Sequence, residues 1–177
     1  MAALSNLQNL QSLPKTLKEL EDEVAELKDL VKKMSTSSSD YGVTTGTLRA
    51  RFSKVSQMTS TGITHGSIRA AGMEWGIQVQ THMEGSTKYL AIYLSIKSRP
   101  IPDSWSATVY KSVKIINHSH KEKSHSSPEA EMTFSATHPS LGHAKYMTFA
   151  SLSNAANGYI KDDSIIVEIH FTVYPNQ

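Results

Sequence analysis

The chain has 177 residues, of which 38% are hydrophobic and 19% charged, and it carries a formal net charge of +2 and no cysteine. This size and composition predict one folded domain with an appendage, and the missing cysteine excludes disulfides, cysteine-ligated zinc and cysteine nucleophiles. The positive charge is spread thinly, whereas nucleic-acid binding needs clustered basic residues, so we expect no nucleic-acid partner. No signal-peptide pattern and no run of 18 apolar residues is present, so we expect a cytoplasmic protein without a membrane partner.

The first predicted element is a coiled-coil helix over residues 13–34, preceded by a disordered N-terminus at residues 1–12. Apolar residues recur at two positions in seven, a narrower stripe than a helix packed on its own domain normally shows. This pattern favours self-association over intramolecular packing. The residues expected at the oligomer interface are Leu13, Leu17, Leu20, Val24, Leu27, Leu30, Val31 and Met34. Their identities do not decide between a dimer and a trimer.

Residues 35–46 are rich in serine, threonine and glycine and are predicted to form a linker. Over residues 47–175 the apolar period becomes two, as in 90–96 and 165–173, which is the pattern of half-buried strands. Turn residues separate six to eight such stretches. The sequence therefore predicts an all-β fold, an antiparallel β-sandwich, with a single helical turn at 150–157 as the exception.

The motifs that could carry catalysis or metal binding are weak. His118, His120 and His125 lie in a polar stretch that reads as a solvated loop, with no obvious further ligand in register. No nucleophile elbow or phosphate-binding glycine loop occurs, and the sequon at Asn117 reads as a polar turn. We therefore expect no enzyme activity, no catalytic residues, no metal and no cofactor, and we favour a binding module.

Four stretches in this order resemble the MATH domain, also called the TRAF-type C-terminal domain, and most closely its divergent nematode members. They are GMEWGIQVQ (72–80), KYLAIYLSI (88–96), WSATV (105–109) and NGYIKDDSIIVEIHFTVY (157–174). The resemblance implies an eight-stranded antiparallel sandwich over residues 47–175 that captures short peptides of partner proteins. It also implies a preceding parallel coiled coil, with a trimer favoured and a dimer possible, and a role as adaptor or substrate-recognition protein in ubiquitin or receptor signalling.

The resemblance further implies a peptide-binding groove, which this sequence matches in part. Tyr93 matches a groove aromatic, and Gly142 matches the glycine of a W-G-F turn. Leu141 and His143 replace the aromatics that flank this glycine. The remaining groove positions hold Met132, where a tyrosine is usual, and Gln78 and Gln80, where receptor-binding members have Arg and Tyr. Such a groove would favour an extended apolar or small-residue peptide added along a sheet edge.

Two other functions remain open from the sequence. A coiled-coil stalk below a β-sandwich head is also the plan of oligomeric lectin-like or fibre-head proteins that bind cell-surface ligands. A purely structural oligomer without a ligand is the third possibility.

Overall fold

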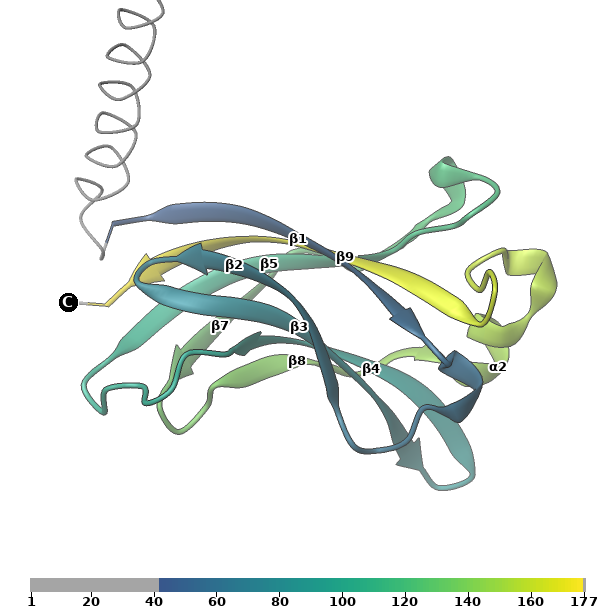
Figure 1. Cartoon of the computed structure of the whole chain (residues 1–177), viewed down its shortest axis with the longest axis horizontal. Coiled ribbons are helices and arrows are strands. Elements are labelled where there is room, and N and C mark those ends of the chain that lie inside the picture. Colours follow the sequence, from purple (N-terminus) through teal and green to yellow (C-terminus); the bar gives the residue numbers. More distant parts are fainter. Residues whose placement is uncertain (1–41, 177) are drawn as a thin grey trace, which may run out of the picture. The chain divides into compact units, whose positions relative to one another are not determined.

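The computed structural model of this protein describes residues 42–176. The predicted N-terminal segment (1–12) and coiled coil (13–34) lie outside the described residues, as does most of the predicted linker. Within residues 42–176, the predicted all-β sandwich is confirmed, because two antiparallel sheets account for nearly all of the secondary structure (Figure 1).

The first sheet contains five strands in the order β1-β9-β5-β6, and β7 pairs with β5 as well. Their bounds are β1 (Thr44–Ser53), β5 (Ser106–Ile115), β6 (His125–Ser126), β7 (Ala130–Ser135) and β9 (Ser164–Pro175). All pairs are antiparallel. The first described strand, β1, pairs with the last, β9, so two segments that are far apart in the sequence lie side by side.

The second sheet contains four strands in the order β2-β3-β4-β8. Their bounds are β2 (Ile63–Ala70), β3 (Met73–Glu84), β4 (Thr87–Ile96) and β8 (Ser140–Thr148). The short helical segments lie in the connections: η2 (Val55–Gln57), η3 (Lys121–Lys123), α2 (Phe149–Ser153) and η4 (Ala155–Asn157). The helical turn predicted at 150–157 corresponds to α2 and η4, with the N-cap hydroxyl of Thr148 accepting from the Ser151 amide.

The described part of the chain thus has nine strands instead of eight, because it includes the two-residue strand β6. Two strands, β2 and β8, have no clear apolar alternation. Most of β2 is exposed, and β8 contains a register irregularity opposite Leu90 and Ile92. The period-two signal is therefore weak in both.

The core lies between the sheets and is mostly aliphatic, with a cluster of aromatic residues around Trp75. Trp75 on β3 is fully buried, and its ring lies 5.1 Å from Phe134, 5.7 Å from Phe171 and 6.2 Å from Trp105. Its indole Nε1 donates to the Ala70 carbonyl at 2.9 Å. A large aromatic side chain can be buried completely when its single hydrogen-bond donor has a partner. Trp75 on β3 contacts Phe134 on β7 and Phe171 on β9, so it packs the second sheet against the first.

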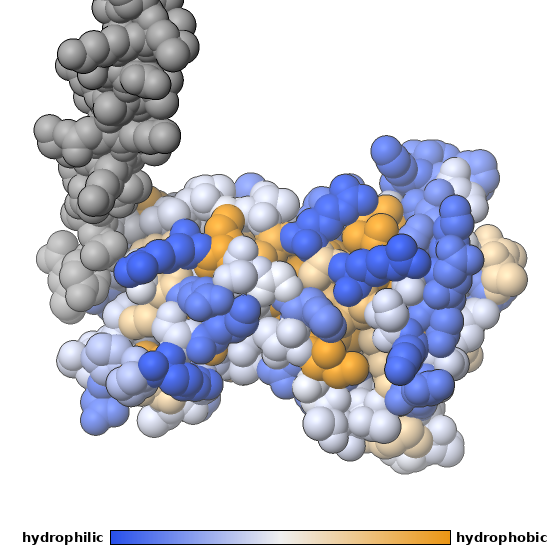
Figure 2. All heavy atoms as spheres, viewed as in Figure 1, coloured by the Kyte–Doolittle hydropathy of each residue, from blue (hydrophilic) through white to orange (hydrophobic). Residues whose placement is uncertain are grey.

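The surface seen in Figure 2 is hydrophilic over most of its area, with hydrophobic residues in small separate areas. The large hydrophobic residues that are exposed in the described range are Val43, Ile63, Met83 and Tyr174. Scattered apolar residues of this kind are normal on soluble proteins. This face therefore offers no single large apolar patch for docking.

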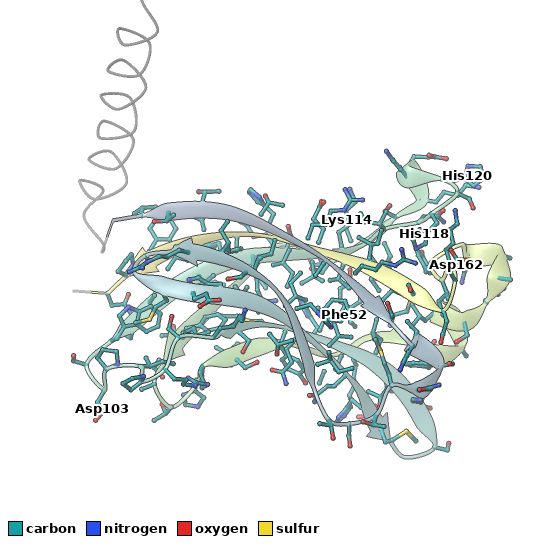
Figure 3. The ribbon with its side chains drawn as sticks, viewed as in Figure 1. Phe52, Asp103, Lys114, His118, His120 and Asp162 are labelled. Atoms are coloured by element: carbon teal, nitrogen blue, oxygen red, sulfur yellow. The ribbon has the colours of Figure 1, made fainter. Side chains whose placement is uncertain are left out.

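Asn117 holds the loops at one end of the sandwich together. Its side-chain Nδ2 donates to the Asn157 carbonyl, and its Oδ1 accepts from the Ser119 and His120 amides at 2.9 and 2.7 Å. Figure 3 shows His118 and His120 at this end, far from Asp103 at the other. Asn117 is only 4% exposed and both polar atoms of its side chain are hydrogen-bonded, so this sequon is a structural turn.

Candidate peptide-binding surface

Three of the predicted groove residues form one row across the second sheet. Tyr93 on β4 pairs with Gln78 on β3 and with Gly142 on β8. Directly opposed residues of an antiparallel sheet point to the same face. Because the next residues on β3 and β4, such as Ile77 and Leu94, are fully buried, this row lies on the outer face. We refer to Gln78, Tyr93 and Gly142 as the outer row.

Hydrogen bonds fix the polar part of the outer row. Ser140 Oγ donates to Gln78 Oε1 at 2.9 Å, and Gln78 Nε2 donates to Gln80 Oε1 at 3.3 Å. Gln80 is in phase with Gln78 on β3 and therefore shares its face. Burial raises the pKa of the Tyr93 phenol, so this ring presents a neutral hydroxyl. The surface combines an aromatic ring with oriented amides.

Gly142 is required by a close approach between β8 and β4. A Cβ built at this position would meet backbone atoms of Ile92 and Tyr93, at less than van der Waals distance. The strands are drawn together beside a register shift, in which Leu90 pairs with Met147 and Ile92 with His143. The extra residues on β8 form a bulge, a feature common at sheet edges.

Strand β8 is the edge of its sheet in the described range. It pairs with β4 and with no other strand of residues 42–176. Its second side therefore presents backbone donors and acceptors that an extended peptide can pair with. The outer row lies directly beside this edge, because Gly142 belongs to β8 itself.

The other predicted groove residues lie elsewhere. Leu141 and His143 pair with Leu94 and Ile92, two fully buried residues, so both point toward the interior of the sandwich. Met132 lies on β7 in the other sheet, where it is half-buried and packs against the core. The structure thus brings Gln78, Gln80, Tyr93 and Gly142 together on one face and places Met132, Leu141 and His143 on the inward side.

Sequence reasoning missed Lys111, which the structure buries completely on the inner face of β5. Its Nζ has no hydrogen-bond partner among residues 42–176. Burial lowers its pKa from 10.5 to about 8. A signal was present in the sequence, because Lys111 is in phase with the apolar residues Val109 and Val113.

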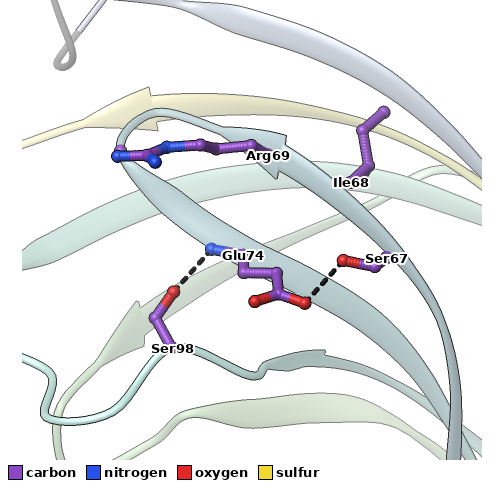
Figure 4. Close-up of a pocket in the computed structure, with 6 residues that line it drawn as sticks. Ser67, Ile68, Arg69, Glu74 and Ser98 are labelled. Carbon is purple, nitrogen blue, oxygen red and sulfur yellow. Dashed lines mark hydrogen bonds between the residues drawn. The ribbon is translucent and has the colours of Figure 1, made fainter.

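A pocket of about 350 Å³ lies at the β2–β3 hairpin, on the opposite edge of the sheet from β8 (Figure 4). Its lining residues are Ser67, Ile68, Arg69, Gly72, Glu74 and Ser98. The Glu74 carboxylate accepts from Ser67 Oγ at 2.6 Å and from Lys97 Nζ at 3.0 Å, and both bonds lower its pKa. The charge of Glu74 is therefore balanced by Lys97, and the carboxylate needs no ligand as a partner.

The histidines of the polar loop are not arranged as a metal site. His120 Nδ1 lies 3.2 Å from Glu122, and no group of three potential ligands is found in residues 42–176. Nor does any helix in that range have the length and apolar character needed to cross a membrane.

The β-sandwich agrees with a comparison against protein families. A family model described as MATH domain matches residues 50–171. The chain belongs to the MATH domain family. MATH domains are protein-interaction domains, so the fold supports a binding role. A search of curated proteins found no match.

Proposed function

We propose that this MATH domain protein is a non-catalytic adaptor or substrate-recognition protein that binds short extended peptides of partner proteins along β8. The observation that carries the proposal is the edge of β8 beside the outer row, which pairs with no further strand in residues 42–176. A peptide added there gains backbone hydrogen bonds from the edge, and its outward side chains extend over Gly142 toward Tyr93. The backbone hydrogen bonds of the edge would supply affinity for the peptide, and the neighbouring side chains would select its sequence.

The proposal extends to assembly and setting. Self-association through residues 13–34, as a trimer or dimer, would place several weak sites in one particle, and coupled sites bind with higher effective affinity. The heptad pattern of the sequence supports this part. A cytoplasmic location and a role in ubiquitin or receptor signalling complete the proposal.

The proposal is tested by selecting peptides from a random display library with the full chain and measuring their affinity in solution. Tyr93→Ala should weaken binding by at least about tenfold, because it removes the aromatic ring from the surface beside the edge. Tyr89→Ala is the matched control, since Tyr89 lies on the same face of β4 but about 13 Å along the strand.

Three results would contradict the proposal. One is that no peptide is selected, and another is that a folded Tyr93→Ala variant binds as the wild type does. The third is binding to a glycan array without peptide binding, which would favour a lectin-like head instead.

A further inference from the structure

Lys111 occupies a position where the fold otherwise places apolar residues. It lies on β5 between Val109 and Val113, two fully buried residues of the same face, and is itself fully buried. Its neighbours across the sheet are Phe171 on β9 and Ala130 on β7. A lysine at such a position is uncommon unless its ammonium group is paired.

The ammonium group of Lys111 is isolated. A long lysine side chain usually extends its nitrogen into water, but this Nζ is inaccessible to solvent and has no partner among residues 42–176. With a pKa of about 8 it is still mostly protonated at neutral pH. A buried ammonium without an anion costs several kcal/mol, so the free protein carries a charge that an anionic ligand could compensate.

This charge lies close to the side of the sandwich where β7 and β8 form the edges. Ala130, its neighbour on β7, is only half-buried, and β7 pairs with no strand beyond β5 in the described range. From β8, His143 faces it: burial and, second, the charge of Lys111 lower the pKa of this imidazole. His143 Nε2 also lacks a partner among the residues described. Two unpaired nitrogens therefore share this region.

The charged groups nearby do not neutralise Lys111. Glu131 on β7 points outward and accepts from the Tyr110 hydroxyl at 2.7 Å. Glu168 on β9 is also on the outer face, near Arg49 at 3.9 Å. His143 is a base with a depressed pKa, so it supplies no negative charge. A bound anion would supply the negative charge that these residues do not provide to the Lys111 ammonium.

We propose that the peptide bound along β8 carries an acidic residue whose carboxylate inserts between β7 and β8 and accepts a hydrogen bond from Lys111 Nζ. This inference rests on the proposed function and names the peptide class: an extended segment with one Asp or Glu. Met132 on β7 is half-buried and packs against the core, and its flexible side chain can move aside for the incoming group. The imidazole of His143 faces the same region from β8.

The experiment uses the full chain and the peptides selected with it from a random library. Each selected peptide is remade with its acidic residue changed to the matching amide, Glu to Gln or Asp to Asn. Wild-type protein should bind the acidic form at least about tenfold more tightly, because the carboxylate pairs with a desolvated cation. Lys111→Met should bind both forms equally, and Lys111→Gln provides a second uncharged variant if the first fails to fold.

Lys114→Met is the matched control. Lys114 lies on the same strand but on the outer face, opposite Glu168, so its loss should leave the preference for the acidic peptide intact. Folding of each variant is checked by circular dichroism and thermal unfolding.

Two kinds of failure are distinguishable. If peptides bind but lack an acidic residue, or if a folded variant without Lys111 keeps the preference, this inference is overturned and the proposed function survives. If no peptide binds at all, both are overturned.

Discussion

The hydroxyl of Tyr146 on β8 donates to the backbone carbonyl of Val113 on β5 at 2.8 Å and so connects the two sheets of the sandwich. The same oxygen lies 3.0 Å from the carbonyl of His125 on β6, and the His125 ring meets the Tyr146 ring edge-on at 5.2 Å. Burial raises the pKa of this phenol strongly, so it remains a neutral donor. The edge strand β8 is thereby held against the opposite sheet.

Tyr146→Phe should lower the free energy of unfolding by about 1–2 kcal/mol, because it removes the donor and leaves buried carbonyl oxygens less well satisfied. Denaturant unfolding of both proteins measures the difference. Tyr110→Phe is the control, since its hydroxyl bonds to an exposed carboxylate, that of Glu131, and should contribute much less. Equal effects of the two changes would contradict the structural role of Tyr146.

Trp75→Phe and Trp105→Phe should differ in their effects on stability. Trp75 loses a buried hydrogen bond to the Ala70 carbonyl together with its packing, whereas Trp105 Nε1 has no partner in the described residues. We expect Trp75→Phe to be the more destabilising by about 1 kcal/mol, and Trp75→Ala to cost about 3–5 kcal/mol. Thermal and denaturant unfolding provide the measurement, and near-normal stability of Trp75→Ala would refute its place in the core.

Gly142→Ala should destabilise the edge beside the outer row. A methyl group there meets the backbone of β4, which cannot move aside cheaply, and such overpacking costs about 1–3 kcal/mol. Gly62→Ala is the matched control, because the atoms nearest to its methyl group would be those of the flexible side chain of Gln78. Hydrogen exchange should show faster exchange at Leu141 and His143 in the first variant only, and equal stability of the two variants would contradict the close approach.

The strands that alternate regularly could be predicted from the sequence, and those that do not could not. The stretch 165–173 lies within β9, and Trp75 lies on β3. Both strands bury one face along most of their length, which produces the apolar alternation seen in the sequence. Strand β2 is exposed over most of its length, so nothing in its composition marks a buried face. The bulge in β8 breaks the period there.

Only part of the arrangement of the candidate site can be predicted from the sequence. Family resemblance makes Tyr93 and Gly142 groove candidates, and the strand register places them in one row. That same register turns Leu141 and His143 inward, a distinction that depends on pairing partners and not on local sequence. The sequence does not single out Lys111, because a lysine within a strand normally lies on the outward face, although its phase places it among buried valines.

Self-association should depend on the predicted interface of the N-terminal region, which lies outside the described residues. Leu20→Asp combined with Leu27→Asp places charge at buried interface positions and should convert the oligomer to monomers. Sedimentation of the full chain measures the mass. Ala25→Asp is the control, because position 25 falls outside the apolar stripe and should leave the mass unchanged. A monomeric wild type at tens of micromolar would end the proposal of coupled sites.

Lys111 should make stability depend on pH in the alkaline range. Its pKa is lower in the folded protein, about 8, than in the unfolded chain, so the unfolded state holds more protons between the two values. Stability therefore rises with pH there, by about 2 kcal/mol from pH 7.5 to 9.5, within a total of about 3 kcal/mol. This range ends below the ordinary pKa of tyrosine, so ionisation of the Tyr146 phenol in the unfolded state offsets only a small part of the rise.

Lys111→Met should abolish this rise and make the protein more stable at pH 7.5, because an apolar side chain of similar length replaces an unpaired buried charge. Lys114→Met, on the outer face of the same strand, should keep the rise. Denaturant unfolding of the three proteins at both pH values gives the comparison. A wild type whose stability does not increase relative to Lys111→Met over this range would show that the Lys111 ammonium is solvated or paired, and the acidic-peptide inference would lose its physical basis.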